Sequence, residues 1–152
     1  MAERGLGPAT GLRALSLLLG VFMLFMGISK FGWLTDTSVL ASRFTEWRDA
    51  GPPAARWYLE TLAIPGMPLF ARIVPLAELA TGLALILGFW TRLAAGLALF
   101  MVLNFHFAMG VLLRYSYLWN GYGPPVLGGL LALVIGGARL PFSVLRIGGL
   151  RR

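Results

Sequence analysis

The fold is decided by the stretch Pro75-Leu-Ala-Glu-Leu-Ala-Thr-Gly-Leu-Ala-Leu-Ile-Leu-Gly-Phe-Trp-Thr-Arg92. This stretch is apolar over most of the length that a transmembrane helix needs, and it contains one carboxylate, Glu78. An ionised group at bilayer depth costs several kcal/mol even on the most lenient insertion scale. We therefore expect Glu78 to face protein or enclosed water and to have a partner elsewhere in the chain.

The composition places the whole chain in a membrane. Of its 152 residues, 58% are hydrophobic and 12% are charged, which is too little polar surface to cover a soluble protein of this size. A hydrocarbon core about 30 Å thick needs roughly 20 apolar residues per helical crossing. The chain has no cysteine, which excludes disulfides, thiolate metal sites and iron–sulfur clusters.

We predict an all-α integral membrane protein, a single domain over residues 1–152 built as a four-transmembrane-helix bundle. The predicted crossings are residues 13–33, 68–90, 93–113 and 123–138. Residues 34–66 form a predicted extracytoplasmic loop with one or two short interfacial helices, and residues 139–152 form a basic cytoplasmic tail. The first crossing is long and lacks a small-residue cleavage site, which favours a retained helix over a secretory signal.

Two predicted crossings carry small residues at every fourth position. These stripes are Ala80, Ala84 and Gly88 in the second crossing, and Gly128, Ala132 and Gly136 in the fourth. Small residues at this spacing let the backbones of membrane helices approach closely. We expect both stripes to face neighbouring helices.

The distribution of charge predicts the orientation. The segments on one side of the predicted bundle carry seven arginines and one glutamate, whereas residues 34–66 carry three arginines and four acidic residues. The positive-inside rule then places both termini in the cytoplasm. The formal charge of +7 is explained by a basic rim against anionic lipid, so we expect no nucleic-acid partner. Most tyrosines and tryptophans fall on the opposite, outer side, which we expect to be a contact surface.

Five polar residues fall in the outer half of the predicted crossings, namely Glu78, Lys30, Arg72, Asn104 and His106. We predict a polar pocket around Glu78, with Lys30 or Arg72 as its counter-ion and Asn104 as its hydrogen-bond partner. Asn104 and His106 lie about 200° apart on a helix, so only one of them can face this pocket. Two interpretations stay open: the polar groups hold the helices in register, or they form a ligand or proton site.

The residue types exclude several kinds of cofactor. Haem in a bundle usually takes two axial side chains, and the only histidine, His106, has Met109 too close on the same helix to reach the opposite face. A catalytic metal generally needs three protein ligands. We predict no metal site and no covalently bound cofactor. The sequence shows no nucleophile with its base, which favours no catalytic activity for the chain alone.

Three features of the sequence resemble the DoxX family. They are Gly27-Ile-Ser-Lys30-Phe at the end of the first crossing, the stretch from Pro75 to Arg92, and a glycine-rich last crossing. The resemblance covers roughly residues 13–138 and implies a four-helix protein of a bacterial or archaeal inner membrane. It also implies a redox or quinone context, because the family name comes from subunits linked to thiosulfate:quinone oxidoreductase and quinol oxidase. Lys30, Glu78 and Arg92 are the matching polar positions, and we expect Arg92 to anchor the cytoplasmic turn.

Three functions are compatible with these observations. The first is an accessory or scaffold subunit that docks onto a larger membrane assembly related to electron transfer, with lipid and other membrane subunits as partners. The second is a quinone- or small-molecule-binding subunit of a membrane oxidoreductase, in which Glu78 exchanges protons and Asn104 or His106 bonds a ring oxygen. The third is a small transporter or channel.

Overall fold

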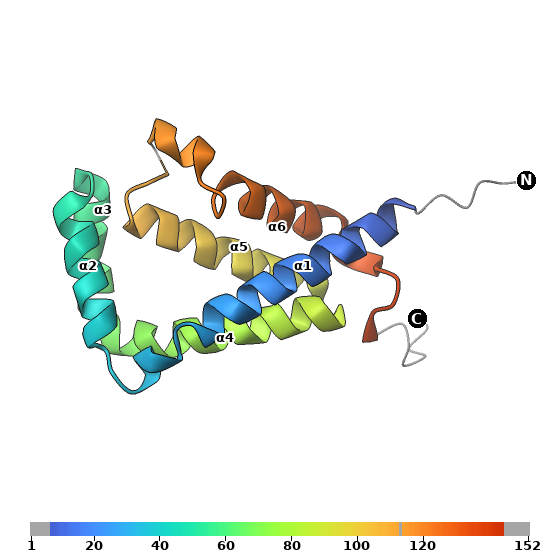
Figure 1. Ribbon diagram of the computed structural model, residues 1–152, viewed down its shortest axis with the longest axis horizontal. Coiled ribbons are helices and arrows are strands. Elements are labelled where there is room, and N and C mark those ends of the chain that lie inside the picture. The colour runs from blue at the N-terminus through green and yellow to red at the C-terminus, as the bar shows by residue number, and fades with distance from the viewer. Residues whose placement is uncertain (1–6, 113, 145–152) are drawn as a thin grey trace, which may run out of the picture.

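The structure is a computed structural model that describes residues 7–112 and 114–144, and every regular element within these residues is a helix. Figure 1 shows the course of the chain. In chain order the elements are α1 (Pro8–Ile28), η1 (Phe31–Leu34), α2 (Ser38–Ala50), α3 (Pro53–Tyr58), η2 (Leu59–Ala63), α4 (Met67–Leu87), α5 (Thr91–Ala108), η3 (Tyr115–Trp119), α6 (Pro124–Gly136) and η4 (Gly137–Arg139).

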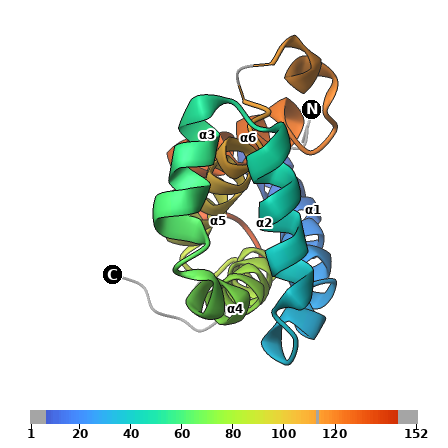
Figure 2. The ribbon, with the colours of Figure 1, turned by 90° about the vertical axis from the view of Figure 1, so that its left-hand side faces the viewer.

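Four helices run lengthwise as a bundle, and two short ones close one of its ends. α1 packs mainly along α4, and α5 packs mainly along α6. α2 and α3 stand across one end of the bundle (Figures 1 and 2), which we call the cap end. The opposite end, where α1 begins and α4 turns into α5, is called the terminal end. The residues predicted to form short interfacial helices are thus the cap of the bundle.

Three helices, α1, α4 and α5, are long and apolar enough to cross a membrane. α6 has 13 residues and spans about 20 Å, which is less than the roughly 30 Å of a hydrocarbon core. The fourth predicted crossing is therefore a helix that is too short to cross alone as a straight rod. The predicted basic tail at residues 139–152 lies mostly outside the described residues.

The third predicted crossing ends five residues early, at Ala108 instead of residue 113. The helix stops because Gly110 takes a left-handed conformation with φ of 66°, which favours glycine. A side chain at Gly110 would also collide with Pro52. Because the helix ends early, His106 lies in the last turn of α5.

Glycines determine how closely α1 approaches α4. A Cβ atom added to Gly82 would lie 2.7 Å from the backbone nitrogen of Leu24, and one added to Gly20 would lie 2.9 Å from the Gly82 carbonyl oxygen. Of the predicted stripe in α4, Ala80 is exposed, whereas Ala84 packs against the core and Gly88 is buried. Glu78, Gly82 and Leu85 face α1. Ala80 lies two residues from both Glu78 and Gly82, which is about 200° around the helix, so it points to the opposite side.

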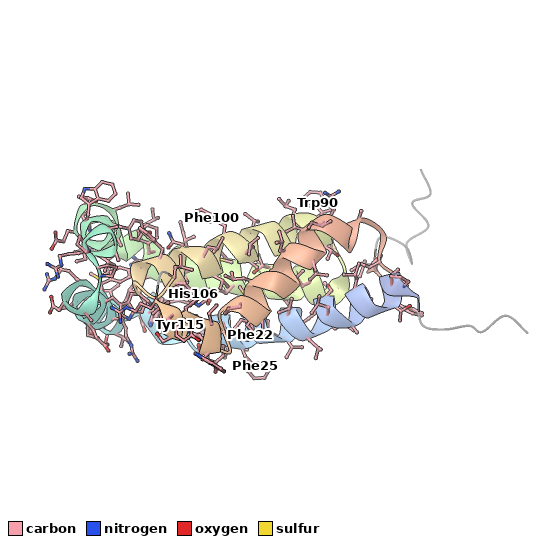
Figure 3. The ribbon with its side chains drawn as sticks, turned by 90° about the horizontal axis from the view of Figure 1, so that it is seen from above. Phe22, Phe25, Trp90, Phe100, His106 and Tyr115 are labelled. Atoms are coloured by element: carbon pink, nitrogen blue, oxygen red, sulfur yellow. The ribbon has the colours of Figure 1, made fainter. Side chains whose placement is uncertain are left out.

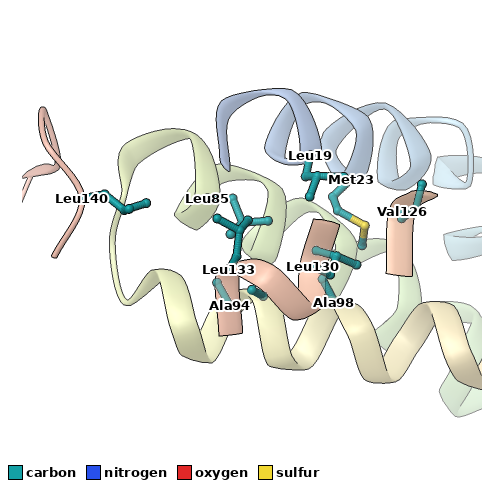
Figure 4. Close-up of a cluster of buried hydrophobic side chains, with 10 residues drawn as sticks. Leu19, Met23, Leu85, Ala94, Ala98, Val126, Leu130, Leu133 and Leu140 are labelled. Atoms are coloured by element: carbon teal, nitrogen blue, oxygen red, sulfur yellow. The ribbon is translucent and has the colours of Figure 1, made fainter. Parts of the chain in front are cut away.

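The predicted stripe in the last crossing is wrong at Gly128 and right at Gly136. A Cβ atom added to Gly128 would have no neighbouring atom within 4 Å, whereas one added to Gly129 or Gly136 would meet leucines of α1. Between them, α1, α4, α5 and α6 enclose an apolar core (Figure 4). Its largest fully buried side chains are Met23, Leu85, Leu130 and Leu133. The bundle is therefore tightly filled toward the terminal end.

A second apolar cluster joins the cap to the bundle. It is formed by Trp33, Leu40, Phe44, Leu59, Ala63, Ala71 and Ala108. Leu40 and Phe44 lie one turn apart on α2, so one face of this helix is buried and the other is exposed. The Gly51-Pro52-Pro53 corner ends α2 and begins α3, because proline cannot continue a helix from the preceding residue.

Candidate ligand-binding site beneath the cap

A buried ion pair lies where α1 meets the cap. Lys30 Nζ is 2.9 Å from Glu78 Oε1 and 2.8 Å from Glu78 Oε2. Lys30 follows the last turn of α1, and Glu78 lies in the middle of α4. The two residues are only 8% and 3% exposed, so the pair is removed from both water and lipid.

The helix packing sets the position of this pair. Gly27 lies against Pro75, where an added Cβ would be 2.9 Å from the Pro75 carbonyl oxygen. Because α1 and α4 run in opposite directions (Figure 1), Lys30 lies on the cap-end side of this contact and Glu78 on its other side, and the long Lys30 side chain reaches back toward the carboxylate. Lys30 Nζ also donates to the Met26 carbonyl oxygen at 3.0 Å. The ammonium group is thus held by α1 itself as well as by Glu78.

Aromatic rings surround the ammonium group on its other sides. Lys30 Nζ lies 5.7 Å from the ring centroid of Trp33 and 5.5 Å from that of Phe105. A cation at this distance from a ring face is attracted by the ring quadrupole. The aromatic contacts help to compensate for the water that Lys30 loses on burial.

A cavity of about 240 Å³ opens beside the ion pair. Most of its wall is apolar or aromatic, and its polar groups come from Lys30, Glu78, His106, Arg43 and Asn120. The remaining lining residues are Phe22, Met23, Met26, Trp33, Trp47, Val102, Phe105, Met109 and Tyr122. An apolar pocket with a few convergent polar groups is the usual form of a small-molecule site.

His106 lines the cavity and contacts Tyr117 of the η3 segment. Its Nδ1 lies 2.9 Å from the hydroxyl oxygen of Tyr117, and the two rings meet edge to face at 5.3 Å. Both residues are buried. Because Tyr117 engages Nδ1, Nε2 is the ring nitrogen left for a ligand. Figure 3 shows His106 in the cap-end half of the bundle, together with Phe22 and Phe25.

Tyr117 is a site residue that the sequence pattern does not reveal. It belongs to a run of aromatic residues that is predicted as a whole to be outer contact surface. Its neighbours Tyr115 and Trp119 are exposed, but Tyr117 is 9% exposed. Burial raises the pKa of the Tyr117 hydroxyl, which favours its neutral, hydrogen-bonding form. The one local sequence feature that accompanies the burial of Tyr117 is Gly123, where an added Cβ would lie 2.8 Å from the Tyr117 ring.

Asn104 lies apart from the ion pair, which corrects its predicted role as partner of Glu78. Its Nδ2 donates to the Tyr58 hydroxyl oxygen at 2.7 Å, and it lines a separate, narrower pocket under the cap. Asn104 and His106 do face different pockets, as the angle between them requires. The one that shares the cavity with Glu78 is His106.

Arg72 is not the counter-ion either. It is exposed, and its Nη1 donates to the Pro68 carbonyl oxygen of its own helix at 2.7 Å. Arg72 precedes Glu78 by six residues, which corresponds to about 240° around a helix. The two side chains therefore leave α4 on different faces, and Lys30 takes the position beside the carboxylate.

At the terminal end, two arginines tie helices together. Arg92 Nε donates to the Val134 carbonyl oxygen at 2.7 Å, which fastens the start of α5 to α6. Arg13, which no sequence motif singles out, is buried and donates to the carbonyl oxygens of Leu85 at 3.0 Å and Ile86 at 2.6 Å. It thereby satisfies carbonyl groups at the C-terminus of α4, where a cation is also favoured by the helix dipole.

Comparison with known families agrees with this architecture. The family model for DoxX matches residues 11–111, which is more than half of the chain. The chain belongs to the DoxX family. Comparisons with curated proteins and with solved structures gave no match. The DoxX match includes Lys30, Glu78 and His106 but ends before η3 and α6.

This DoxX membership, together with three apolar helices of membrane length, establishes a membrane protein. Among the described residues, no group of three histidine, aspartate or glutamate side chains is placed to hold a metal ion. The chemistry that the site offers is therefore that of its own ion pair, imidazole and aromatic rings.

Proposed function

We propose that this DoxX protein binds a small ring compound of the quinone class in the cavity beneath the cap, as a subunit of a membrane redox assembly. The observation that supports the proposal is a buried Lys30–Glu78 pair in the wall of an otherwise apolar and aromatic cavity. Quinones combine an apolar ring with oxygen atoms that accept hydrogen bonds, which matches both parts of this wall.

Each polar residue has a role in the proposal. The Lys30 ammonium group donates to one ring oxygen, and Nε2 of His106 donates to or accepts from the other polar group of the ligand. Glu78 exchanges a proton when the ring changes between quinone and quinol. We assign binding and proton exchange to this chain, and the transfer of electrons to a partner subunit.

The cavity favours binding over a purely structural role for the ion pair. Protein interiors are close-packed, with few voids larger than a water molecule. A pair that only holds α1 and α4 in register needs no empty volume beside it, and Gly27 and Gly82 already fix that register. The cavity holds about 240 Å³, which is room for a substituted six-membered ring.

Fluorescence quenching tests the proposal. The full chain is reconstituted in lipid nanodiscs and titrated with a tail-free dimethoxy-methyl-benzoquinone, which quenches tryptophan emission. Trp33 and Trp47 line the cavity, so we expect a saturable component of quenching that disappears in the Trp33→Phe/Trp47→Phe variant. Quenching that rises linearly with quinone in all variants would contradict the proposal.

A matched pair of substitutions on α5 separates binding from general effects on the fold. Val102 lines the cavity, whereas its neighbour Leu103 is 38% exposed on the outer surface of the bundle. Val102→Phe fills part of the cavity and should weaken the saturable component about tenfold. Leu103→Phe should leave it unchanged.

A second candidate function is docking onto a larger membrane assembly. The cap and η3 expose large side chains, with Trp119 80% exposed, Tyr115 76% and Trp57 66%. Clusters of exposed aromatic residues mark contact surfaces or membrane interfaces. We also propose that the cap end faces away from the cytoplasm of an inner membrane, on the basis of the charge distribution. Co-purification from native membranes tests docking, and loss of the partner in Trp119→Ser would support it.

A further inference from the structure

The short helix α6 leaves one side of the bundle to be closed by a loop. α1 has 21 residues, about 32 Å of helix, whereas α6 has 13 residues, about 20 Å. Toward the terminal end, α6 packs against both α1 and α5. Toward the cap end it is replaced by the segment that follows η3, and the loop residues Asn120 and Tyr122 become part of the cavity wall.

A single pair of aromatic rings closes this wall against α1. The rings of Phe22 and Tyr122 stack with their centroids 5.8 Å apart and an angle of 26° between their planes. Tyr122 is 64% exposed, although one face of its ring stacks on Phe22 and both residues line the cavity. Within the loop, Asn120 accepts from the Tyr122 backbone N–H through Oδ1 at 2.9 Å.

The surface around this pair is suited to lipid tails and not to water. On the adjacent outward face of α1, Leu18 is 71% exposed, Phe25 65% and Val21 43%. Phe25 points away from the bundle in Figure 3. α1 is one of the helices long and apolar enough to cross a membrane, so this apolar face lies against the bilayer. The cavity wall also includes Arg43 of α2, whose exposed side chain pairs with Glu46.

We infer that the ligand carries an alkyl or isoprenoid tail, and that this tail leaves the cavity laterally between Phe22 and Tyr122 into the bilayer. This inference rests on the proposed function and specifies the ligand as a lipid-resident quinone, not a water-soluble one. The head lies beside Lys30 and Glu78, and the aromatic pair parts to admit the tail.

The sequence has no cysteine, so introduced cysteines can test the gap between Phe22 and Tyr122, which we call the portal. Phe22→Cys and Tyr122→Cys are combined and joined by a flexible bis-methanethiosulfonate, which a thiol reductant later removes. The probes are the tail-free dimethoxy-methyl-benzoquinone and its 6-decyl derivative, measured in nanodiscs by tryptophan quenching. Each single-cysteine variant treated with a monofunctional methanethiosulfonate is the matched control.

We expect the affinity of the linked protein for the decyl quinone to fall about tenfold or more. Reductive removal of the linker should restore this affinity. Unchanged decyl binding in the linked protein would overturn the inference, as would an Arg43→Ala variant that alters decyl association while the linked pair does not. If the linked protein loses binding of both probes, the portal admits the head as well, which supports the inference. If neither probe binds to the wild type, the proposed function itself fails.

Discussion

The two ends of the bundle each bury one cation against α4, but in different surroundings. At the terminal end, Arg13 donates to the carbonyl oxygens of Leu85 and Ile86, and close-packed side chains surround it. At the cap end, Lys30 binds the Glu78 carboxylate beside a cavity of about 240 Å³. Burial of a charge is thus common to both ends, but Arg13 is bound by backbone carbonyl oxygens, whereas Lys30 is bound by a carboxylate beside a cavity.

This difference shows how a structural cation can be separated from a functional one. The Arg13 guanidinium donates to carbonyl oxygens at the end of α4 through Nη1 and Nη2, and its buried Nε has no partner among the described residues. The Lys30–Glu78 pair costs desolvation energy for two charges and adjoins space that packing does not fill. We therefore expect the two ends to respond differently when their cations are removed.

The largest effect is expected when Lys30 alone is removed. Lys30→Met leaves the Glu78 carboxylate buried without a partner, which should cost about 3–5 kcal/mol of unfolding free energy. Saturable quinone quenching should disappear as well. Stability is measured by denaturant unfolding in detergent micelles, with Arg72→Met as control because Arg72 is exposed on the same bundle. A loss below about 1 kcal/mol would show that the pair is not buried as described.

Removal of the other cation should reduce stability without affecting binding. Arg13→Met removes the side-chain donor of the Ile86 carbonyl oxygen and one donor of the Leu85 carbonyl oxygen, which still accepts from Ser16 Oγ, and this should cost about 1–3 kcal/mol. Quinone affinity should stay at the wild-type value, because Arg13 lies at the opposite end of the bundle from the cavity. The same unfolding and quenching assays give both numbers. An equal loss of affinity would mean that the two ends are coupled.

A pair of glycine substitutions compares tight and loose packing. Gly82→Ala places a Cβ 2.7 Å from the Leu24 backbone nitrogen, so α1 and α4 must separate, which should cost about 1–3 kcal/mol. Gly128→Ala has open space around it and should be neutral or slightly stabilising. Thermal unfolding of the two variants side by side is the measurement. Equal stability of the two would contradict the described contact between α1 and α4.

The smallest effect is expected at Tyr117. Tyr117→Phe removes the hydrogen bond to His106, which should cost about 1 kcal/mol and weaken quinone binding several-fold. Burial raises the pKa of Tyr117, so its contribution to stability is fully present below pH 10, the ordinary value for tyrosine, and is lost as pH rises through the higher folded value. The decrease in stability above pH 10 should therefore be smaller in Tyr117→Phe than in the wild type.

Much of the fold is predictable because hydrophobic runs and breakers are local signals. The runs that form α1 and α4, and the Gly51-Pro52-Pro53 corner, follow directly from apolar length and from proline chemistry. The end of α5 is predicted too late because Leu112 and its neighbours are as apolar as the helix. Its actual stop depends on Gly110 and its contact with Pro52, which lies far away in sequence.

The candidate site is predictable only in part. A carboxylate within an apolar helix demands a partner, which directs attention to Glu78 and Lys30. The sequence leaves Lys30 and Arg72 as alternatives, and only the contact of Gly27 with Pro75 brings Lys30 into place. The cavity, the role of Tyr117 and the pairing of Phe22 with Tyr122 depend on how a loop folds back over the bundle, for which no periodic pattern exists.

The most direct measurement is the affinity for tail-free benzoquinone of a variant that replaces both charges, Lys30→Met/Glu78→Leu. Apolar replacement of a whole buried ion pair is often neutral or stabilising, so this variant should fold with a stability within about 1 kcal/mol of the wild type. If the pair forms a binding site, its quinone affinity falls about tenfold or more. A stable double variant that binds quinone as tightly as the wild type would contradict the site.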